Sequence, residues 1–295
     1  MRMHDPFRRL WRLSVLLLAL APRAGFGADH PAIERPIMMD SNGPGTELYV
    51  LDESGVLHEF HVMENGLQEY GRVSAPSDFV AADMSFLQSK APASVLIAGT
   101  QSGRGLVMRL SLASSVVQTW GFQNVCSGVD TGSSGDTAYV ATSDSNEIYR
   151  VDTQKAHTTF IAHIPDASKL GPVAFDEERQ EIYVADVASG QVYQYSIATK
   201  TSKVLVTHLS APTALAFDAE TRQLFIADPG QRAIYTVDAR APKPAAVLFA
   251  SDPLKAPYGL TLLSEGRVAV ADYGADSILV FSGKGALLFR YPAAR

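Results

Sequence analysis

Three aspartates recur at the same place in a repeated pattern, and their carboxylates are the first groups in the sequence that could do chemistry. Asp186, Asp228 and Asp272 each end an apolar run that closes with the pair Ala-Asp. Carboxylate oxygens bind metal ions, but side chains in separate repeats would lie too far apart to share one ion. An aspartate directly before a tight turn accepts hydrogen bonds from the backbone of that turn. We therefore predict that these aspartates shape turns.

The histidines and the cysteine lack catalytic partners at a recognisable spacing. His163 and His208 end polar segments, His58 and His61 lie early in the chain, and we interpret all four as solvated residues. Cys126 is the only cysteine, which excludes an intramolecular disulfide, and we interpret it as a small core residue. The sequence contains no CxxC or HExxH spacing.

A unit of about 44 residues repeats six times along the chain. Its clearest copies contain residues 182–186 (IYVAD), 224–228 (LFIAD) and 268–272 (VAVAD), each followed after five residues by a second apolar run. Short runs rich in Val, Ile, Tyr, Phe and Leu between Gly, Pro, Asp and Ser indicate strands. The aligned positions within the six units are 49, 96, 139, 183, 225 and 269.

The repeat predicts an all-β fold, a six-bladed β-propeller with four antiparallel strands in each blade. The first two strands of each unit are almost wholly apolar, so neighbouring sheets must cover both of their faces. The count begins on an innermost strand near Ile37 and ends on an outermost strand near Leu288. If every blade thus consists of consecutive strands, the ring closes by packing of the first blade on the last, unless residues 28–33 supply an exchanged strand.

Propeller topology gathers two sets of loops around one end of the axis, which we call the mouth. These are the loops that enter each innermost strand and the loops between the second and third strands. Polar ligands or peptide loops suit such a surface. The predicted contacts for a ligand or partner are Arg104, Lys169, Arg232, Tyr258 and Tyr273.

The repeat resembles the NHL and YVTN-type propeller repeats and, more loosely, the YWTD type. The resemblance is carried by residues 182–186 (IYVAD), by residues 225–228 (FIAD) and by the lead-in at 212–218 (PTALAFD). It extends over nearly the whole chain after the N-terminal segment. Propellers of these types bind proteins, glycans, small ligands or RNA, or act as lactonases and lyases, so the resemblance implies a fold and leaves the function open.

A more distant resemblance to the regucalcin/gluconolactonase family implies an enzymatic alternative. That family holds a divalent ion on Glu, Asn and Asp side chains at the axial mouth, and Glu34, Asp78 and Asn124 would be the corresponding oxygen ligands for Ca²⁺ or another divalent cation. The chain departs from the family at residues 34–36, where Glu-Arg-Pro replaces Glu-Gly-Pro, and it lacks the Asn-Gly lead-in. The alternative is a metal-dependent lactonase-type hydrolase.

The N-terminus is typical of a secretory signal peptide. Four arginines among residues 1–12 precede an apolar run at 13–21, and small residues lead to a cleavage site after Gly27. The run is too short for a membrane anchor, which needs about 20 apolar residues. We predict a signal peptide at residues 1–27, using the general or the twin-arginine route, a propeller at 28–295, and a periplasmic or secreted location.

The predicted mature chain is acidic. Removing residues 1–27 takes away five arginines and one aspartate, so the net charge changes from −6 to about −10. Because nucleic acids and anionic membranes are bound by clustered positive charge, we expect neither as a partner. The sequence therefore predicts an exported, monomeric, non-enzymatic scaffold, without a cofactor, that binds a protein partner or a small polar ligand at the axial mouth.

Overall fold

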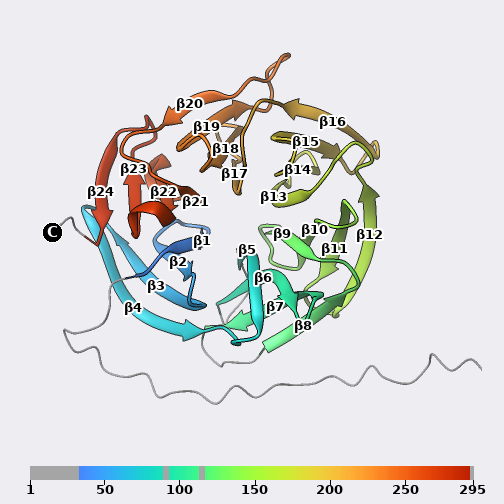
Figure 1. Cartoon of the computed structure of the whole chain (residues 1–295), viewed down its shortest axis with the longest axis horizontal. Coiled ribbons are helices and arrows are strands. Elements are labelled where there is room, and N and C mark those ends of the chain that lie inside the picture. Colours follow the sequence, from blue (N-terminus) through green and yellow to red (C-terminus); the bar gives the residue numbers. More distant parts are fainter. Residues whose placement is uncertain (1–32, 89–92, 113–116, 293–295) are drawn as a thin grey trace, which may run out of the picture.

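The repeated units form six four-stranded sheets arranged around a central axis (Figure 1). The structure is a computed structural model that describes residues 33–88, 93–112 and 117–292. The predicted signal peptide lies outside the described residues. The prediction of an all-β, six-bladed propeller with four antiparallel strands per blade is confirmed.

The first three blades are each built from consecutive strands. In every blade the first strand lies beside the axis and the fourth lies at the rim. The strands are β1 (Pro36–Ser41), β2 (Glu47–Asp52), β3 (Val56–Met63), β4 (Gly66–Ser74), β5 (Phe79–Leu87), β6 (Ser94–Gln101), β7 (Arg104–Ser111), β8 (Val117–Phe122), β9 (Cys126–Thr131), β10 (Thr137–Thr142), β11 (Glu147–Asp152) and β12 (His157–His163).

The last three blades repeat this plan, and within the described residues the only helical segments are two short 3₁₀ turns in blade 6. The elements are β13 (Leu170–Asp176), β14 (Glu181–Asp186), β15 (Gln191–Ser196), β16 (Thr201–Val206), β17 (Ala214–Asp218), β18 (Gln223–Asp228), β19 (Ala233–Asp238), β20 (Val247–Ala250), β21 (Pro257–Leu262), η1 (Ser264–Gly266), β22 (Val268–Asp272), η2 (Tyr273–Ala275), β23 (Ser277–Phe281) and β24 (Leu287–Tyr291). No helix among the described residues has the length and apolar character to cross a membrane.

The core consists of six apolar clusters, one between each pair of neighbouring blades. The repeated ring at the third position of β14 shows the principle: Tyr183 is fully buried and lies 5.2 Å, between ring centroids, from Phe217 of the next blade. Burial of one such side chain contributes about 1.5–3 kcal/mol. The stability of the ring therefore depends on face-to-face packing of sheets, as the apolar repeat predicts.

The ring closes between blades 6 and 1 without an exchanged strand among the described residues. Ile33, just before β1, joins the apolar cluster between these two blades. Beside the axis, the Ser41 hydroxyl donates to the Leu262 carbonyl (2.6 Å) and the Thr261 hydroxyl donates to Asp40 (2.9 Å). Side-chain hydrogen bonds and apolar packing thus replace the backbone pairing that an exchanged strand would provide. Residues 28–32, part of the alternative closing segment, lie outside the described residues.

Candidate functional site

The mouth forms as predicted, because aspartates at the ends of second strands hold the loops that enter first strands. Asp186 accepts the backbone N–H groups of Ser168 (2.7 Å) and Lys169 (3.0 Å), and it also accepts from its own turn. Asp228 and Asp272 bind the equivalent loops of blades 5 and 6 in the same way. The prediction that these aspartates accept hydrogen bonds from their own turns is confirmed for Asp186 and Asp228, whereas, among the described residues, the Asp272 side chain makes no such bond to the turn that follows it. Each of the three fixes a mouth loop.

One polar and aromatic group, the mouth cluster, spans blades 1 and 6. It consists of Arg35, Glu53, Tyr258 and Tyr273. Arg35 donates to Glu53 (2.9 Å), its guanidinium lies 5.4 Å from the centre of the Tyr273 ring, and the Tyr273 hydroxyl donates to Glu53 (3.1 Å). The hydrogen bond from Arg35 lowers the pKa of Glu53. The rings of Tyr258 and Tyr273 lie 5.1 Å apart, and Tyr258 remains 39% exposed.

The structure brings together two of the five predicted contact residues, the tyrosines of the mouth cluster. Arg104, Lys169 and Arg232 are exposed at the mouth ends of β7, β13 and β19. Among the described residues, no hydrogen bond or ion pair joins these cations to each other or to the tyrosines. They stand around the mouth as separate charges.

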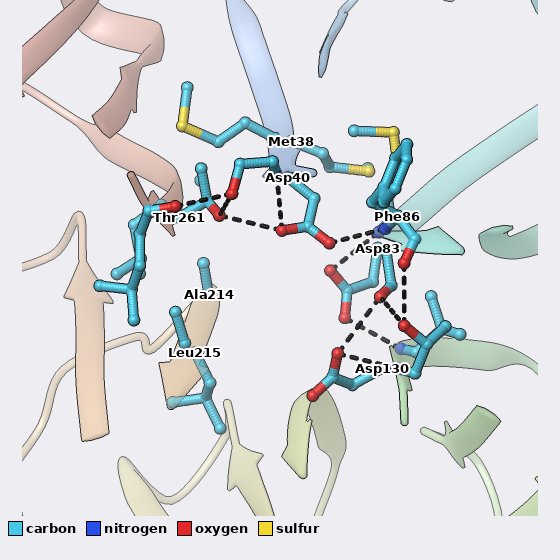
Figure 2. A pocket seen from close by; sticks show the side chains of 18 of the residues that line it. Met38, Asp40, Asp83, Phe86, Asp130, Ala214, Leu215 and Thr261 are labelled. Carbon is cyan, nitrogen blue, oxygen red and sulfur yellow. Dashed lines mark hydrogen bonds between the residues drawn. The ribbon is translucent and has the colours of Figure 1, made fainter. Parts of the chain in front are cut away.

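A cavity of about 290 Å³ lies on the axis, and Tyr258 is the only one of the five predicted contacts that lines it. Its lining extends from Tyr258 at the mouth to Asn42 and Gly132, in turns on the opposite face. Its two sides differ: Figure 2 shows acidic groups from β1, β5 and β9 facing apolar side chains of β17. The labelled residues on these sides are Asp40, Asp83, Asp130, Ala214 and Leu215.

The three axial carboxyl groups each accept a backbone N–H from the next blade. Asp40 accepts from Phe86 (2.6 Å), Asp83 accepts from Val129 (3.0 Å), and Asp130 accepts from Phe175 (2.7 Å). These residues were not identified by sequence reasoning. The hydrogen bonds link blades 1 to 2, 2 to 3 and 3 to 4, so the acidic wall of the cavity is also part of the framework.

Their surroundings disfavour the charged form of these carboxyl groups. Burial, together with the neighbouring carboxylates, raises the pKa of Asp83 to about 8 and that of Asp130 to about 7. Burial also raises the pKa of Asp40. A carboxyl group that titrates near neutral pH in a cavity can take part in proton transfer, and the same residues hold adjacent blades together.

A signal for two of the axial aspartates is present in the sequence. In four blades the aromatic residue of the second strand pairs with one position of the inner strand. That position is occupied by Asp40 in blade 1, Asp130 in blade 3, Ala174 in blade 4 and Ala216 in blade 5. Comparing the inner strands position by position would have found both. Asp83 is harder to detect, because the residue at the aligned position in blade 2 is Ser85, opposite Leu96, and Asp83 lies two residues earlier, opposite Ala98.

The three oxygen ligands implied by the enzymatic resemblance lie in separate surroundings. Both Asp78 oxygens accept from the Gln101 amide (2.9 Å each), the Asn124 amide donates to Glu147 (3.0 Å), and Glu34 is exposed. Within the described residues, no three His, Cys, Asp or Glu side chains are grouped to hold a metal ion. In the present arrangement Asp78 and Asn124 bind other side chains, and metal binding by these residues stays a prediction.

The interpretation of His58 as a solvated residue is wrong. Its side chain is 2% exposed, and its ring nitrogens contact Glu69 (2.8 Å) and Asp52 (3.1 Å). Glu69 also pairs with Arg72 and accepts from the Tyr291 hydroxyl of blade 6 (3.4 Å). This buried charged group stabilises the junction between blades 1 and 6. Pairing of β3 with β4 creates it, and sequence spacing alone does not reveal that pairing.

Cys126 is a core residue, as predicted. It is fully buried on β9, and burial raises the pKa of its thiol to about 12. A thiol with this pKa is almost entirely protonated at neutral pH and is a poor nucleophile.

Comparison with known families and structures supports this type of propeller. Residues 170–294, which contain blades 4 to 6, match the family model of the SMP-30/gluconolactonase/LRE-like region. This match spans less than half of the chain. Together with the six blades, it confirms the predicted similarity to propellers of the NHL and gluconolactonase type. No curated protein sequence matches the chain.

Among solved structures, a chain in the crystal structure of a nidogen/laminin complex has the same fold. The two chains are 14% identical with a TM-score of 0.69, and the match covers 83% of this chain and 92% of that chain. Identity this low shows the fold alone. In all, 1590 chains of solved structures match, so the fold by itself does not select a function.

Proposed function

We propose that the protein is an exported, non-enzymatic propeller scaffold that binds a protein partner or a small polar ligand at its axial mouth. The observation that carries the proposal is the exposed Tyr258 ring where the mouth meets the axial cavity, beside the paired Arg35 and Glu53. An exposed aromatic ring provides apolar contact area with little loss of side-chain freedom on binding. Cations around the mouth would orient an incoming acidic group.

Two further observations support binding as the role of this surface. The axial carboxyl groups accept backbone hydrogen bonds between blades, so they have a structural task that does not require a reaction. In addition, the structurally similar chain belongs to a nidogen/laminin complex, so a propeller of this size can serve in a protein assembly. The export proposal depends on the N-terminal segment and places such a partner in the periplasm or outside the cell.

Charge reversal at the mouth is expected to weaken partner capture. The variant Arg104→Glu/Arg232→Glu should retain about tenfold less partner than the wild type from a periplasmic extract of the source organism, because both exposed cations border the mouth. Arg179→Glu/Lys284→Glu makes the same charge change in turns on the opposite face and should capture normally. Quantitative mass spectrometry of the captured proteins measures the difference, and equal capture by all three proteins would discard the proposed contacts.

A second candidate function, a metal-dependent lactonase-type hydrolase, is favoured by the family match over residues 170–294. The axial Asp83 and Asp130, with pKa values of about 8 and 7, would be able to exchange protons at neutral pH. Glu34, Asp78 and Asn124 are the residues proposed to hold Ca²⁺ or another divalent cation, which would polarise the lactone carbonyl.

A metal-titrated thermal melt separates the two functions. If the hydrolase proposal is correct, Ca²⁺ or Zn²⁺ at about 100 times its Kd should stabilise the protein by about 2.7 kcal/mol, which is several degrees in melting temperature. Glu34→Gln should abolish the shift, whereas Glu64→Gln, in an exposed turn on the opposite face, should keep it. A melting temperature that neither ion changes would reject metal-dependent hydrolysis and leave the scaffold.

A further inference from the structure

A second concave surface, the rim groove, lies between the outer parts of blades 4 and 5, and one end of it is formed by residues 207–209 and Gln231 in loops of the mouth face. Its volume is about 510 Å³. One side is the end of β16 and the loop after it, residues 204–209, and the other is Pro244, Ala245 and Ala246 before β20. Gln231 and Tyr235 of blade 5 complete the lining.

The groove exists because the third and fourth strands of blade 5 are joined by an unusually long connection. Eight residues, 239–246, separate β19 from β20, compared with four, 197–200, at the same place in blade 4. Pro242 and Pro244 cannot donate to a sheet, so β20 begins only at Val247 and has four residues. Within the described part of the chain, the backbone N–H groups of Ala245 and Ala246 have no hydrogen-bond partner. They are available to the carbonyl groups of another chain.

The surface of the groove is apolar in part, and Thr207, His208 and Gln231 contribute polar groups to its lining. Leu205 and Leu209 belong to the core cluster between blades 4 and 5 and form its floor. Val204 in the groove is 44% exposed, and Val247 and Leu248, directly after it in the chain, are 61% and 56% exposed. Exposed apolar side chains that adjoin a concave surface are typical of a protein-binding site.

The charge of this region is opposite to that of the whole protein. The two flanking segments, 197–217 and 239–251, contain no Asp or Glu, although the predicted mature chain has a net charge of about −10. Arg240 is paired with Asp238 at 3.9 Å, just outside the second segment. Lys203 and Lys243 are exposed, and no ion pair engages them within the described residues. Lys203 directly precedes the groove residue Val204 and lies next to the groove without lining it.

We propose that the rim groove docks an extended segment of a partner protein with alternating apolar and acidic side chains. Its apolar side chains contact Val204, Val247 and Leu248, its carboxylates lie by Lys203 and Lys243, and one of its carbonyl groups accepts the N–H of Ala245. Alternate side chains of such an extended segment provide the specificity. None of the five residues predicted to contact a ligand at the mouth lines this surface, and the proposal does not rest on the function proposed there.

Binding of two designed peptides to the purified protein tests the proposal. The probe is a fluorescein-labelled ten-residue peptide that alternates Glu and Val, and the reference peptide has Lys in place of every Glu. Fluorescence anisotropy should show saturable binding of the Glu peptide and at least about tenfold weaker binding of the Lys peptide. Lys203→Glu/Lys243→Glu should weaken binding of the Glu peptide by about tenfold as well. Val247→Ser should weaken it without changing its salt dependence, because it removes apolar contact and no charge.

The matched control is Lys155→Glu/Lys284→Glu, which makes the same charge change at exposed lysines of blades 3 and 6 and should bind the Glu peptide normally. Equal binding of both peptides, no binding of the Glu peptide, or normal binding by the groove variant would overturn the proposal. Sedimentation with phosphatidylglycerol vesicles that is lost in the groove variant would also overturn it, because the surface would then be assigned to lipid headgroups.

Discussion

Replacing His58 with glutamine is expected to lower the free energy of unfolding by about 3–5 kcal/mol, the usual cost of removing one partner from a buried ion pair. His58 is buried between Asp52 and Glu69, and Glu69 in turn contacts Arg72 and, across the ring junction, Tyr291. Glutamine retains a donor for one carboxylate and removes the positive charge that both require. Chemical denaturation followed by tryptophan fluorescence measures the loss.

The size of this loss should depend on pH. Burial alone would lower the pKa of His58, but hydrogen bonds to Asp52 and Glu69 outweigh burial and raise the pKa above 6.5. The folded state therefore holds the proton more tightly than the unfolded chain. The resulting stabilisation is complete below pH 6.5 and is lost as the pH rises through the raised pKa of the folded state.

Protonation of Glu69 sets the lower end of the pH range in which this ion pair stabilises the fold. Burial would raise the pKa of Glu69, but hydrogen bonds from His58 and Arg72 lower it from 4.5 to about 2. That stabilisation is present above pH 4.5 and is lost as the pH falls toward 2. The difference between wild type and His58→Gln should thus be largest from about pH 4.5 to 6.5 and should shrink at alkaline pH.

His61→Gln is the matched control. His61 lies on the same strand, is exposed, and stacks on Tyr70 with ring centroids 4.1 Å apart. Its replacement should change the free energy of unfolding by less than about 0.5 kcal/mol at every pH. If His58→Gln behaved like His61→Gln, or if its cost did not vary between pH 5 and 9, the ionic account of this junction would be wrong.

The fold was predictable because its determinants are local and repeated. Positions 49, 96, 139, 183, 225 and 269 all fall on second strands, and Ile37 and Leu288 fall on the first inner and last outer strands. An apolar pattern that requires cover on both faces of every sheet, repeated at nearly constant spacing, leaves few arrangements other than a ring of blades. The prediction thus depended on which residues must be buried, and the repeated pattern of apolar residues in the sequence shows this.

The site was predictable only in part, because its geometry depends on which side chains meet across blades. Tyr258 and Tyr273 were found from topology, since Tyr258 lies where β21 begins at the mouth and Tyr273 directly follows β22. The axial carboxyl of Asp83 was not, because it lies two residues before Ser85, the residue of blade 2 at the position of Asp40 and Asp130. His58 and Glu69 are eleven residues apart and meet through the pairing of β3 with β4. Such contacts follow from register, which repeat spacing does not define.

Side-chain hydrogen bonds beside the axis join most pairs of neighbouring blades. Aspartates accept backbone N–H groups from the next blade at the first three junctions, and hydroxyls of Thr213 and Thr261 make the links from blade 5 to 6 and from blade 6 to 1. Between blades 4 and 5 the equivalent inner position is Ala174, which has no polar side chain. At this junction the polar contact is the ion pair between Arg222 and Asp176, the last residue of β13.

Replacing Arg222 with methionine is accordingly expected to destabilise the protein by about 3–5 kcal/mol. Arg222 of blade 5 is 5% exposed, donates to Asp176 of blade 4 at 2.9 Å, and lies 5.6 Å from the centre of the Phe217 ring. Asp176 is 1% exposed, and its second carboxylate oxygen has no hydrogen-bond partner among the residues that the structure describes. Without the guanidinium, this buried carboxylate loses its only buried cation among the described residues.

If charge pairing between Arg222 and Asp176 holds this junction, a second substitution at Asp176 should restore stability. Adding Asp176→Asn to Arg222→Met should recover part of the lost stability, because the double variant no longer buries an unpaired charge. Arg179→Met, an exposed arginine in the turn that follows Asp176, should cost less than about 0.5 kcal/mol. Denaturation midpoints at pH 7 compare the stability of these variants with that of the wild type. A double variant less stable than Arg222→Met would mean that packing of the arginine on Phe217, and not charge pairing, holds blades 4 and 5 together at this place.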